Sequence, residues 1–148
     1  MRSAALIAVD WGTTHARAYR LDGAGGVLGV RAGPLGINKL GDLAYPDALA
    51  RLLGDWIDVP VPRIACGMVG SRQGWREAPY VDCPASLAAL SRGLVETGPD
   101  GIAIVPGLAT RDAAGVPDVM RGEETQILGA VPADSPRTLV VLPGTHSK

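Results

Sequence analysis

The chain has 148 residues, 47% of them hydrophobic, and its 14 Lys and Arg against 15 Asp and Glu give a formal net charge of -1. This balance excludes a strongly basic nucleic-acid-binding protein, because such a protein binds by releasing counterions from phosphates. The apolar content predicts a folded core rather than a disordered chain. The longest apolar runs fall far short of the ~18 residues that span a bilayer, so the sequence predicts no membrane segment.

The chain contains two cysteines, Cys66 and Cys83. They are too few for a disulfide framework and do not form a metal-ligand cluster. We therefore expect a protein of the reducing cytoplasm.

The first part of the chain predicts three strands in succession. Residues 4–9 form an apolar run typical of a central strand, and residues 16–22 alternate between apolar and polar side chains. A glycine turn at 23–26 leads to a third strand at 27–31. The protein thus begins with an antiparallel meander rather than with the strand-to-helix unit of dinucleotide-binding folds.

The rest of the chain predicts alternating helices and strands. Apolar residues at helical spacing mark a helix over 46–57, with Pro46 in its first turn. Leu87, Leu90 and Leu94 mark a second helix. The remaining predicted elements are strands at 64–66, 102–105 and 138–142 and a third helix at 122–130. The order β-β-β-α-β-α-β-α-β predicts a mixed α/β sheet whose first hairpins are antiparallel.

Two stretches of the chain resemble each other. LIAVDWGTTHAR and LVVLPGTHSK each carry a short apolar strand followed by a turn, and Gly12–Thr13 pairs with Gly144–Thr145. We interpret the second stretch as the start of another copy of the same fold. Residues 1–137 then form one lobe, and residues 138–148 form the first strand and turn of a second lobe, truncated in this chain.

The segment DWGTT contains the first candidate functional residues. A strand that ends in Asp10 and turns through Gly12 presents backbone N–H groups and the hydroxyls of Thr13 and Thr14 to an anion. Asp10 is placed to hold Mg²⁺ beside phosphate oxygens, and Arg17 adds positive charge nearby. The alternative is an ordinary turn in which these side chains satisfy backbone groups.

The segment GMVGSRQGW follows a predicted buried strand and is rich in small residues. Its glycines, with Ser71, Arg72 and Gln73 as donors, suit a loop that a small anionic or hydroxylated ligand approaches. The alternative is a glycine-rich turn with Trp75 packed on the core. No GxxxxGK[ST] or GxGxxG pattern occurs, which excludes a P-loop and a Rossmann site.

The segment MRGEETQ places Glu123 and Glu124 at the start of a predicted helix. Either carboxylate is a candidate base for a substrate hydroxyl during phosphoryl transfer. The alternative is that both simply complement the helix dipole, as acidic residues in a first turn do. Arg121 precedes them and suits a substrate carboxylate, unless it is merely exposed.

In combination, these segments resemble the 2-dehydro-3-deoxygalactonokinase family, and DWGTT resembles the first phosphate motif of the actin and sugar-kinase superfamily. The likeness covers the whole chain and rests on the motifs DWGTT, GMVGSRQGW, VPGL, MRGEETQ and PGTHSK. The resemblance implies a ribonuclease-H-like mixed sheet flanked by helices, one lobe of an actin-like two-lobed kinase. It also implies ATP-dependent phosphorylation of 2-dehydro-3-deoxy-D-galactonate in bacterial galactonate breakdown.

The resemblance also assigns expected roles to residues. The first phosphate hairpin would comprise Asp10, Gly12, Thr13 and Thr14 with Arg17 nearby, Mg²⁺ would lie at Asp10, and the second hairpin would begin at Gly144 and Thr145. Glu123 is preferred over Glu124 as the base, without a decision between them. The sugar-acid cleft would be lined by Ser71, Gln73 and Trp75, and Arg121 is our chemical choice for the substrate carboxylate.

Other functions stay open at this point. One is a kinase for a different sugar or keto-deoxy acid, a second is a noncatalytic sugar-acid-binding lobe, and a third is an actin-like ATPase subunit. The expected partners are a small sugar acid, ATP and Mg²⁺, with no nucleic acid and no membrane, and a homodimer is left open. Since phosphoryl transfer needs both phosphate-binding elements, we expect this chain alone to have little kinase activity.

Overall fold

The structure is a computed structural model that describes residues 3–99, 101–132, 134–143 and 147–148. Its strands are β1 (Ala4–Trp11), β2 (Ala16–Asp22), β3 (Val27–Gly33), β4 (Arg63–Cys66), β5 (Tyr80–Asp82), β6 (Val95–Glu96), β7 (Ala103–Ile104), β8 (Gly107–Arg111) and β9 (Pro117–Met120). Its α-helices are α1 (Tyr45–Leu53), α2 (Leu87–Arg92) and α3 (Glu123–Ala130).

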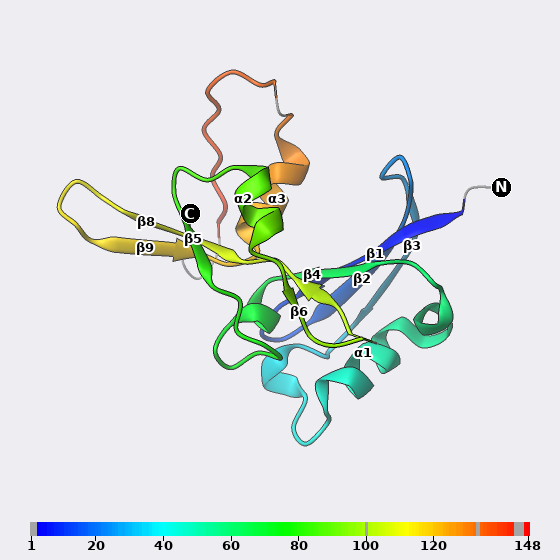
Figure 1. The fold of residues 1–148 in the computed structure, drawn as a ribbon. Coiled ribbons are helices and arrows are strands. Elements are labelled where there is room, and N and C mark those ends of the chain that lie inside the picture. Colours follow the sequence, from blue (N-terminus) through cyan, green and yellow to red (C-terminus); the bar gives the residue numbers. More distant parts are fainter. Residues whose placement is uncertain (1–2, 100, 133, 144–146) are drawn as a thin grey trace.

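The strands form two sheets. The larger sheet has the order β3-β2-β1-β4-β7-β6, and the smaller has the order β5-β8-β9. In the larger sheet β1, β2 and β3 are antiparallel neighbours, β4 runs parallel to both β1 and β7, and β6 is antiparallel to β7. Figure 1 shows α1 on one side of this sheet and α2 and α3 on the other, while the β8–β9 hairpin extends away from it. The predicted mixed α/β sheet with an antiparallel opening is confirmed.

Tight turns fix the register of the opening meander. The carboxylate of Asp22 accepts hydrogen bonds from the backbone N–H groups of Ala24 and Gly26, at 3.0 and 2.7 Å. These bonds close the turn between β2 and β3 as an Asp side chain commonly does. Ile7 and Val9 in β1 alternate with more exposed residues, so one face of the sheet is apolar.

Helix α1 covers that apolar face. Its buried residues Leu49, Leu52 and Leu53 pack in one cluster with Ile7 and Val9. The helix ends at Leu53, earlier than the predicted 57, because Gly54 takes a φ of +52°. The chain then continues as a 3-10 helix over Gly54–Asp58.

The predicted strand at 138–142 is wrong: its residues have no regular secondary structure. Leu139 and Val141 are 89% and 67% exposed, and no strand lies beside them in the described part of the chain. A strand needs a neighbour for its backbone groups. Among the described residues, Leu142 exchanges two backbone hydrogen bonds with Lys148, at 2.8 and 3.0 Å.

The smaller sheet and β6 were not predicted. Their strands are two to five residues long and mostly exposed, so they carry little of the apolar alternation that marks a strand in sequence.

Among the described residues, no helix combines the length and apolar character that membrane crossing requires.

Candidate functional site

The turn between β1 and β2 is supported by a second segment of chain. The N–H of Gly12 donates to the carbonyl of His15 at 2.9 Å, which closes the turn. The carbonyls of Gly12, Thr13 and Thr14 accept from the N–H groups of residues 37, 38 and 36, at 3.0, 2.9 and 3.1 Å. This support leaves the side chains of Thr13 and Thr14 exposed to solvent.

Gly36 makes that support possible. A Cβ at this position would lie 2.2 to 2.4 Å from backbone atoms of Thr13 and Thr14. Only a residue without a side chain allows the two segments to approach so closely.

Asp10 lies at the end of β1, opposite Arg17 of β2 and Cys66 of β4. Burial raises the pKa of its carboxyl, the nearby Arg17 guanidinium lowers it, and the negative charge of Glu123 raises it further. Asp10 and Glu123 are thus close enough to interact, although they lie 113 positions apart in the chain.

Two glycines bring the start of α3 against the end of β1. Gly67, directly after β4, has a φ of +95°, and a Cβ there would lie 2.8 Å from the carbonyl oxygen of Trp11. Gly122, directly before α3, has a φ of +108°, and a Cβ there would lie 3.2 Å from the Cα of Gly67. Both positions require glycine for conformation as well as for space.

The two carboxylates at the start of α3 differ in their surroundings. Glu123 is partly exposed, and its Oε2 accepts a hydrogen bond from the backbone N–H of Arg121 at 2.9 Å. Glu124 is 1% exposed, and its carboxylate accepts from the N–H of Gly122 at 2.7 Å and from the hydroxyl of Thr125 at 3.2 Å. Burial raises the pKa of Glu124.

One cavity of about 730 Å³ joins these elements. It is lined by Asp10, Gly12, Thr13, Gly67, Met68, Arg121, Gly122, Glu123, Gln126, Leu142 and Pro143. Five of the sequence-predicted residues therefore face one space: Asp10, Gly12, Thr13, Arg121 and Glu123. The cavity lies at the carboxyl ends of the parallel strands β1 and β4, where open α/β sheets commonly bind ligands.

The predicted cleft residues Ser71, Gln73 and Trp75 are not among the residues that line this cavity. Trp75 stacks on Tyr45 with ring centroids 5.8 Å apart, and its ring lies 6.2 Å from that of Trp11. The Tyr45 hydroxyl donates to the carbonyl of Gln73 at 3.0 Å. This aromatic cluster packs against β1, the strand that carries Asp10. The buried Ser71 hydroxyl has no hydrogen-bond partner in the part of the chain that the structure describes.

Arg121 has a guanidinium group that is packed against other parts of the chain. Its Nη2 donates to the carbonyl of Ala78 at 2.8 Å, and its Cζ lies 4.3 Å from the centre of the Tyr80 ring. Its Nε and Nη1 are buried and have no hydrogen-bond partner among the described residues. Arg121 itself is half-buried and lines the cavity.

Three other predicted residues, Thr14, Arg17 and Glu124, lie outside the lining. Thr14 is exposed in the turn, and Glu124 is buried. Gly144 and Thr145 fall outside the described residues. Arg17 lines a neighbouring groove of about 300 Å³ that shares Asp10 and Gln126 with the main cavity.

Sequence reasoning missed the separate importance of Gly36, Gly67, Gly122, Met68 and Gln126. The glycines were visible as glycines near the ends of predicted elements, which is a signal for a special backbone angle or a close approach. Met68 and Gln126 carry no such signal.

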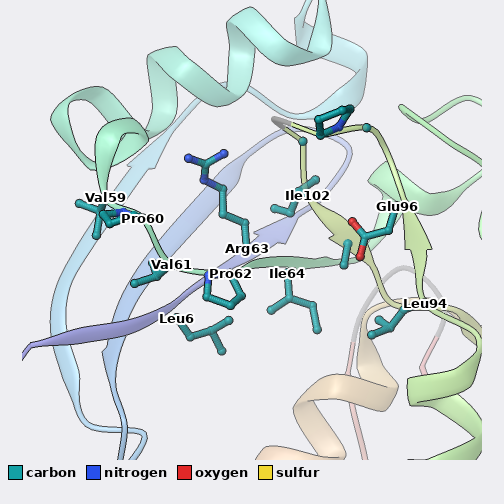
Figure 2. A pocket seen from close by; sticks show the side chains of 14 residues that line it. Leu6, Val59, Pro60, Val61, Pro62, Arg63, Ile64, Leu94, Glu96 and Ile102 are labelled. Atoms are coloured by element: carbon teal, nitrogen blue, oxygen red, sulfur yellow. The ribbon is translucent and has the colours of Figure 1, made fainter.

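A second cavity, of about 510 Å³, lies at the opposite end of the larger sheet. Figure 2 shows Leu6, Pro62, Ile64 and Ile102 around it, with Arg63 and Glu96 at its sides. It lies at the amino ends of the parallel strands β1 and β4. The mostly aliphatic and proline lining offers few groups for chemistry, so we do not place the functional site there.

The main cavity suits a divalent cation held jointly with phosphates. Within the described residues, no three His, Cys, Asp or Glu side chains are arranged to hold a metal by themselves. Mg²⁺ is commonly bound by one or two carboxylates together with substrate phosphates. The half-buried Asp10 fits this mode.

The fold is a mixed α/β lobe with a cavity at the carboxyl ends of its parallel strands, and it is shared with a protein of the kinase class. A crystal structure of a candidate 2-dehydro-3-deoxygalactonokinase from Sinorhizobium meliloti matches 96% of this chain with a TM-score of 0.81 and 43% identity. This chain covers 48% of that protein.

Sequence comparison gives the particular family. A profile of the 2-keto-3-deoxy-galactonokinase family matches residues 10–148, and the chain belongs to this family. It is 40% identical over 99% of its length to the 2-dehydro-3-deoxygalactonokinase of Escherichia coli K12. It is 43% identical over 95% of its length to a Rhizobium meliloti protein named as a probable 2-dehydro-3-deoxygalactonokinase. The chain spans about half the length of these relatives, 49% and 47%.

Proposed function

We propose that this chain is the N-terminal lobe of an enzyme that transfers a phosphoryl group from ATP to the terminal hydroxyl of 2-dehydro-3-deoxy-D-galactonate. Its membership of the family and the names of its relatives support the proposal. The single observation that carries it is the cavity in which the Asp10 carboxylate and the Gly12–Thr13 turn face Glu123.

In this proposal Glu123 is the base. It lines the cavity, while Glu124 does not, and its carboxylate can accept the proton of a substrate hydroxyl. Asp10 holds Mg²⁺, and Gly12, Thr13 and Thr14 contact the phosphates. When bound, ATP and Mg²⁺ supply the transferable phosphoryl group and neutralise its charge.

The sugar acid is held in this proposal mainly by its charge. Arg121 is the candidate for the carboxylate, because it lines the cavity and its guanidinium carries a positive charge. Arg17 contributes positive charge beside Asp10. Ser71, Gln73 and Trp75 stay candidates for sugar contacts, although they lie outside the main cavity.

We further propose that residues 1–137 form this lobe and that residues 138–148, with Gly144 and Thr145, begin a second lobe with the other phosphate hairpin. The coverage of about half of each relative supports this division. Because positioning supplies most of the catalysis in phosphoryl transfer, the chain alone is expected to show little turnover. The proposed location is the cytoplasm.

The proposal is tested with a chimera in which residues 1–148 are followed by the part of the Rhizobium meliloti relative that they do not cover. We expect ADP release with the keto-deoxy acid, ATP and Mg²⁺, and none with the 148-residue chain alone. Glu123→Gln in the chimera is expected to lower kcat by ~10²–10⁴-fold, because it removes the general base.

Glu96→Gln is the matched control, since Glu96 is exposed beside the opposite cavity in Figure 2 and should leave kcat unchanged. Turnover with neutral hexoses only would contradict the proposed substrate. Full turnover in Glu123→Gln would contradict the proposed base.

A further inference from the structure

Glu124 is a buried carboxylate that the proposed reaction does not use. It is 1% exposed, and its Oε2 accepts the N–H of Gly122 at 2.7 Å. Its Oε1 accepts the hydroxyl of Thr125 at 3.2 Å. A buried carboxylate costs free energy unless hydrogen bonds compensate it, and here both oxygens are engaged.

The hydrogen bonds that Glu123 and Glu124 accept come from neighbouring peptide groups. The carboxylate of Glu123 accepts the N–H of Arg121, and the carboxylate of Glu124 accepts the N–H of Gly122. Each side chain thus reaches back two residues to an amide in the turn before α3. The two contacts hold consecutive peptide groups and together fix how the turn enters the helix.

The peptide of Gly122 is also the point where α3 meets the rest of the site. Gly122 has a φ of +108°, and its Cβ direction points at the Cα of Gly67, which in turn lies against Trp11. A rotation of this peptide would therefore change the distance between the start of α3 and the end of β1. The distance between these two ends in turn determines how far Glu123 lies from Asp10.

We propose that Glu124 is a positioning residue: by accepting the Gly122 N–H it sets the turn that presents Glu123 to the cavity opposite Asp10. The inference rests on the proposed function for the role of Glu123. Glu124 itself does not line the cavity, so the proposed function does not assign it the role of base. The role requires a hydrogen-bond acceptor on a side chain as long as that of Glu124, and it does not require a negative charge.

Two variants separate reach from charge. Glu124→Gln keeps an oxygen at the same reach and removes the charge, whereas Glu124→Asp keeps the charge and shortens the side chain by one methylene. In the chimera we expect Glu124→Gln to retain kcat within about tenfold, and Glu124→Asp to lose roughly a hundredfold, since small misplacements of a reacting group cost about that much. KM for ATP should change little in both.

A spectroscopic readout on the 148-residue chain does not depend on turnover. In ¹H–¹⁵N spectra the amide resonance of Arg121 reports its bond to Glu123, and Glu123→Gln gives its position when the charged acceptor is lost. We expect the Arg121 resonance to stay at its wild-type position in Glu124→Gln. In Glu124→Asp it should move toward the Glu123→Gln position.

The possible outcomes test whether Glu124 positions Glu123. If Glu124→Gln is as inactive as Glu123→Gln, the charge of Glu124 is needed and the positioning role is wrong. The role is also wrong if Glu124→Asp leaves both kcat and the Arg121 resonance unchanged. If the chimera has no kinase activity, the proposed function fails, while the Arg121 resonance still shows whether Glu124 sets the place of Glu123.

Discussion

Asp10 and Cys66 lie opposite each other on β1 and β4. Burial at this position disfavours the charged form of both side chains. Burial raises the pKa of the Cys66 thiol to about 12, and the Asp10 carboxylate adds to this effect. The thiolate is the reactive form of cysteine, so Cys66 is inert near neutral pH. Cys83, in contrast, is exposed.

We therefore predict that iodoacetamide at neutral pH labels the folded chain once, at Cys83. Peptide mapping by mass spectrometry checks the site, and Cys83→Ser should abolish labelling of the folded chain. In denaturant, both cysteines should react. Rapid labelling of Cys66 in the folded chain would contradict the burial of its thiol.

Glu124 predicts a pH dependence of stability. Its pKa is raised above the ordinary 4.5 by burial, so the folded state favours the neutral form. The associated stabilisation is present below pH 4.5 and is lost as the pH rises through the raised value. Glu124→Gln has no titrating group at this position. Its free energy of unfolding, relative to that of the wild type, should therefore increase between pH 4 and pH 7.

Urea denaturation of both proteins across this pH range checks the prediction. The difference between the two proteins is the quantity to follow, because Asp10 also has a raised pKa and contributes equally to both. A difference that does not vary with pH would contradict the burial of a titrating Glu124.

At the scale of elements, the turn after β1 depends on a neighbouring segment of chain. The three carbonyls of residues 12–14 accept hydrogen bonds from the backbone of residues 36–38. Thr13 and Thr14 are therefore held in place without using their own side chains. The support requires that Gly36 have no side chain.

Gly36→Ala is predicted to destabilise the chain by about 1–3 kcal/mol or more, the usual cost of overpacking, because its Cβ would overlap backbone that cannot move easily. Gly23→Ala is the matched control: a Cβ there meets nothing within 4 Å. Thermal or urea unfolding measures both variants. Equal stability of the two would show that residues 36–38 do not contact the turn.

At the scale of the whole molecule, stability is unevenly distributed between the two sheets. The buried cluster is formed mainly by the larger sheet and α1, with Ile7, Val9 and Leu53 among its most buried members. The strands of the smaller sheet are largely exposed, with only Gly107 buried in β8. Regions with few buried apolar contacts open at lower free energy.

Hydrogen exchange should reveal this difference. We predict that amides of β1 and of its partner strands exchange slowest, and that amides of β8 and β9 exchange through a separate opening at lower free energy. Exchange measured by NMR at several urea concentrations distinguishes the two classes. A single common opening for both sheets would show that the smaller sheet is part of the main cooperative unit.

The sequence by itself determined several of the local elements and the family. The apolar run of β1, the glycine turn before β3 and the helical spacing of α1 are local patterns, and all three elements are present, although α1 ends four residues before the predicted 57. The resemblance carried by DWGTT and MRGEETQ likewise led to the family, because such motifs combine residue types that a chemistry requires.

Only the tertiary structure decided which of these residues meet. Asp10 and Glu123 share a cavity because Gly67 and Gly122 touch, and that contact joins segments far apart in the chain. Glu123 and Glu124 look alike in sequence, yet one is partly exposed and the other buried, since neighbours on a helix point in different directions. Residues 138–142 have the composition of a strand, yet no strand among the described residues pairs with them. Pairing is a property of the fold rather than of the segment.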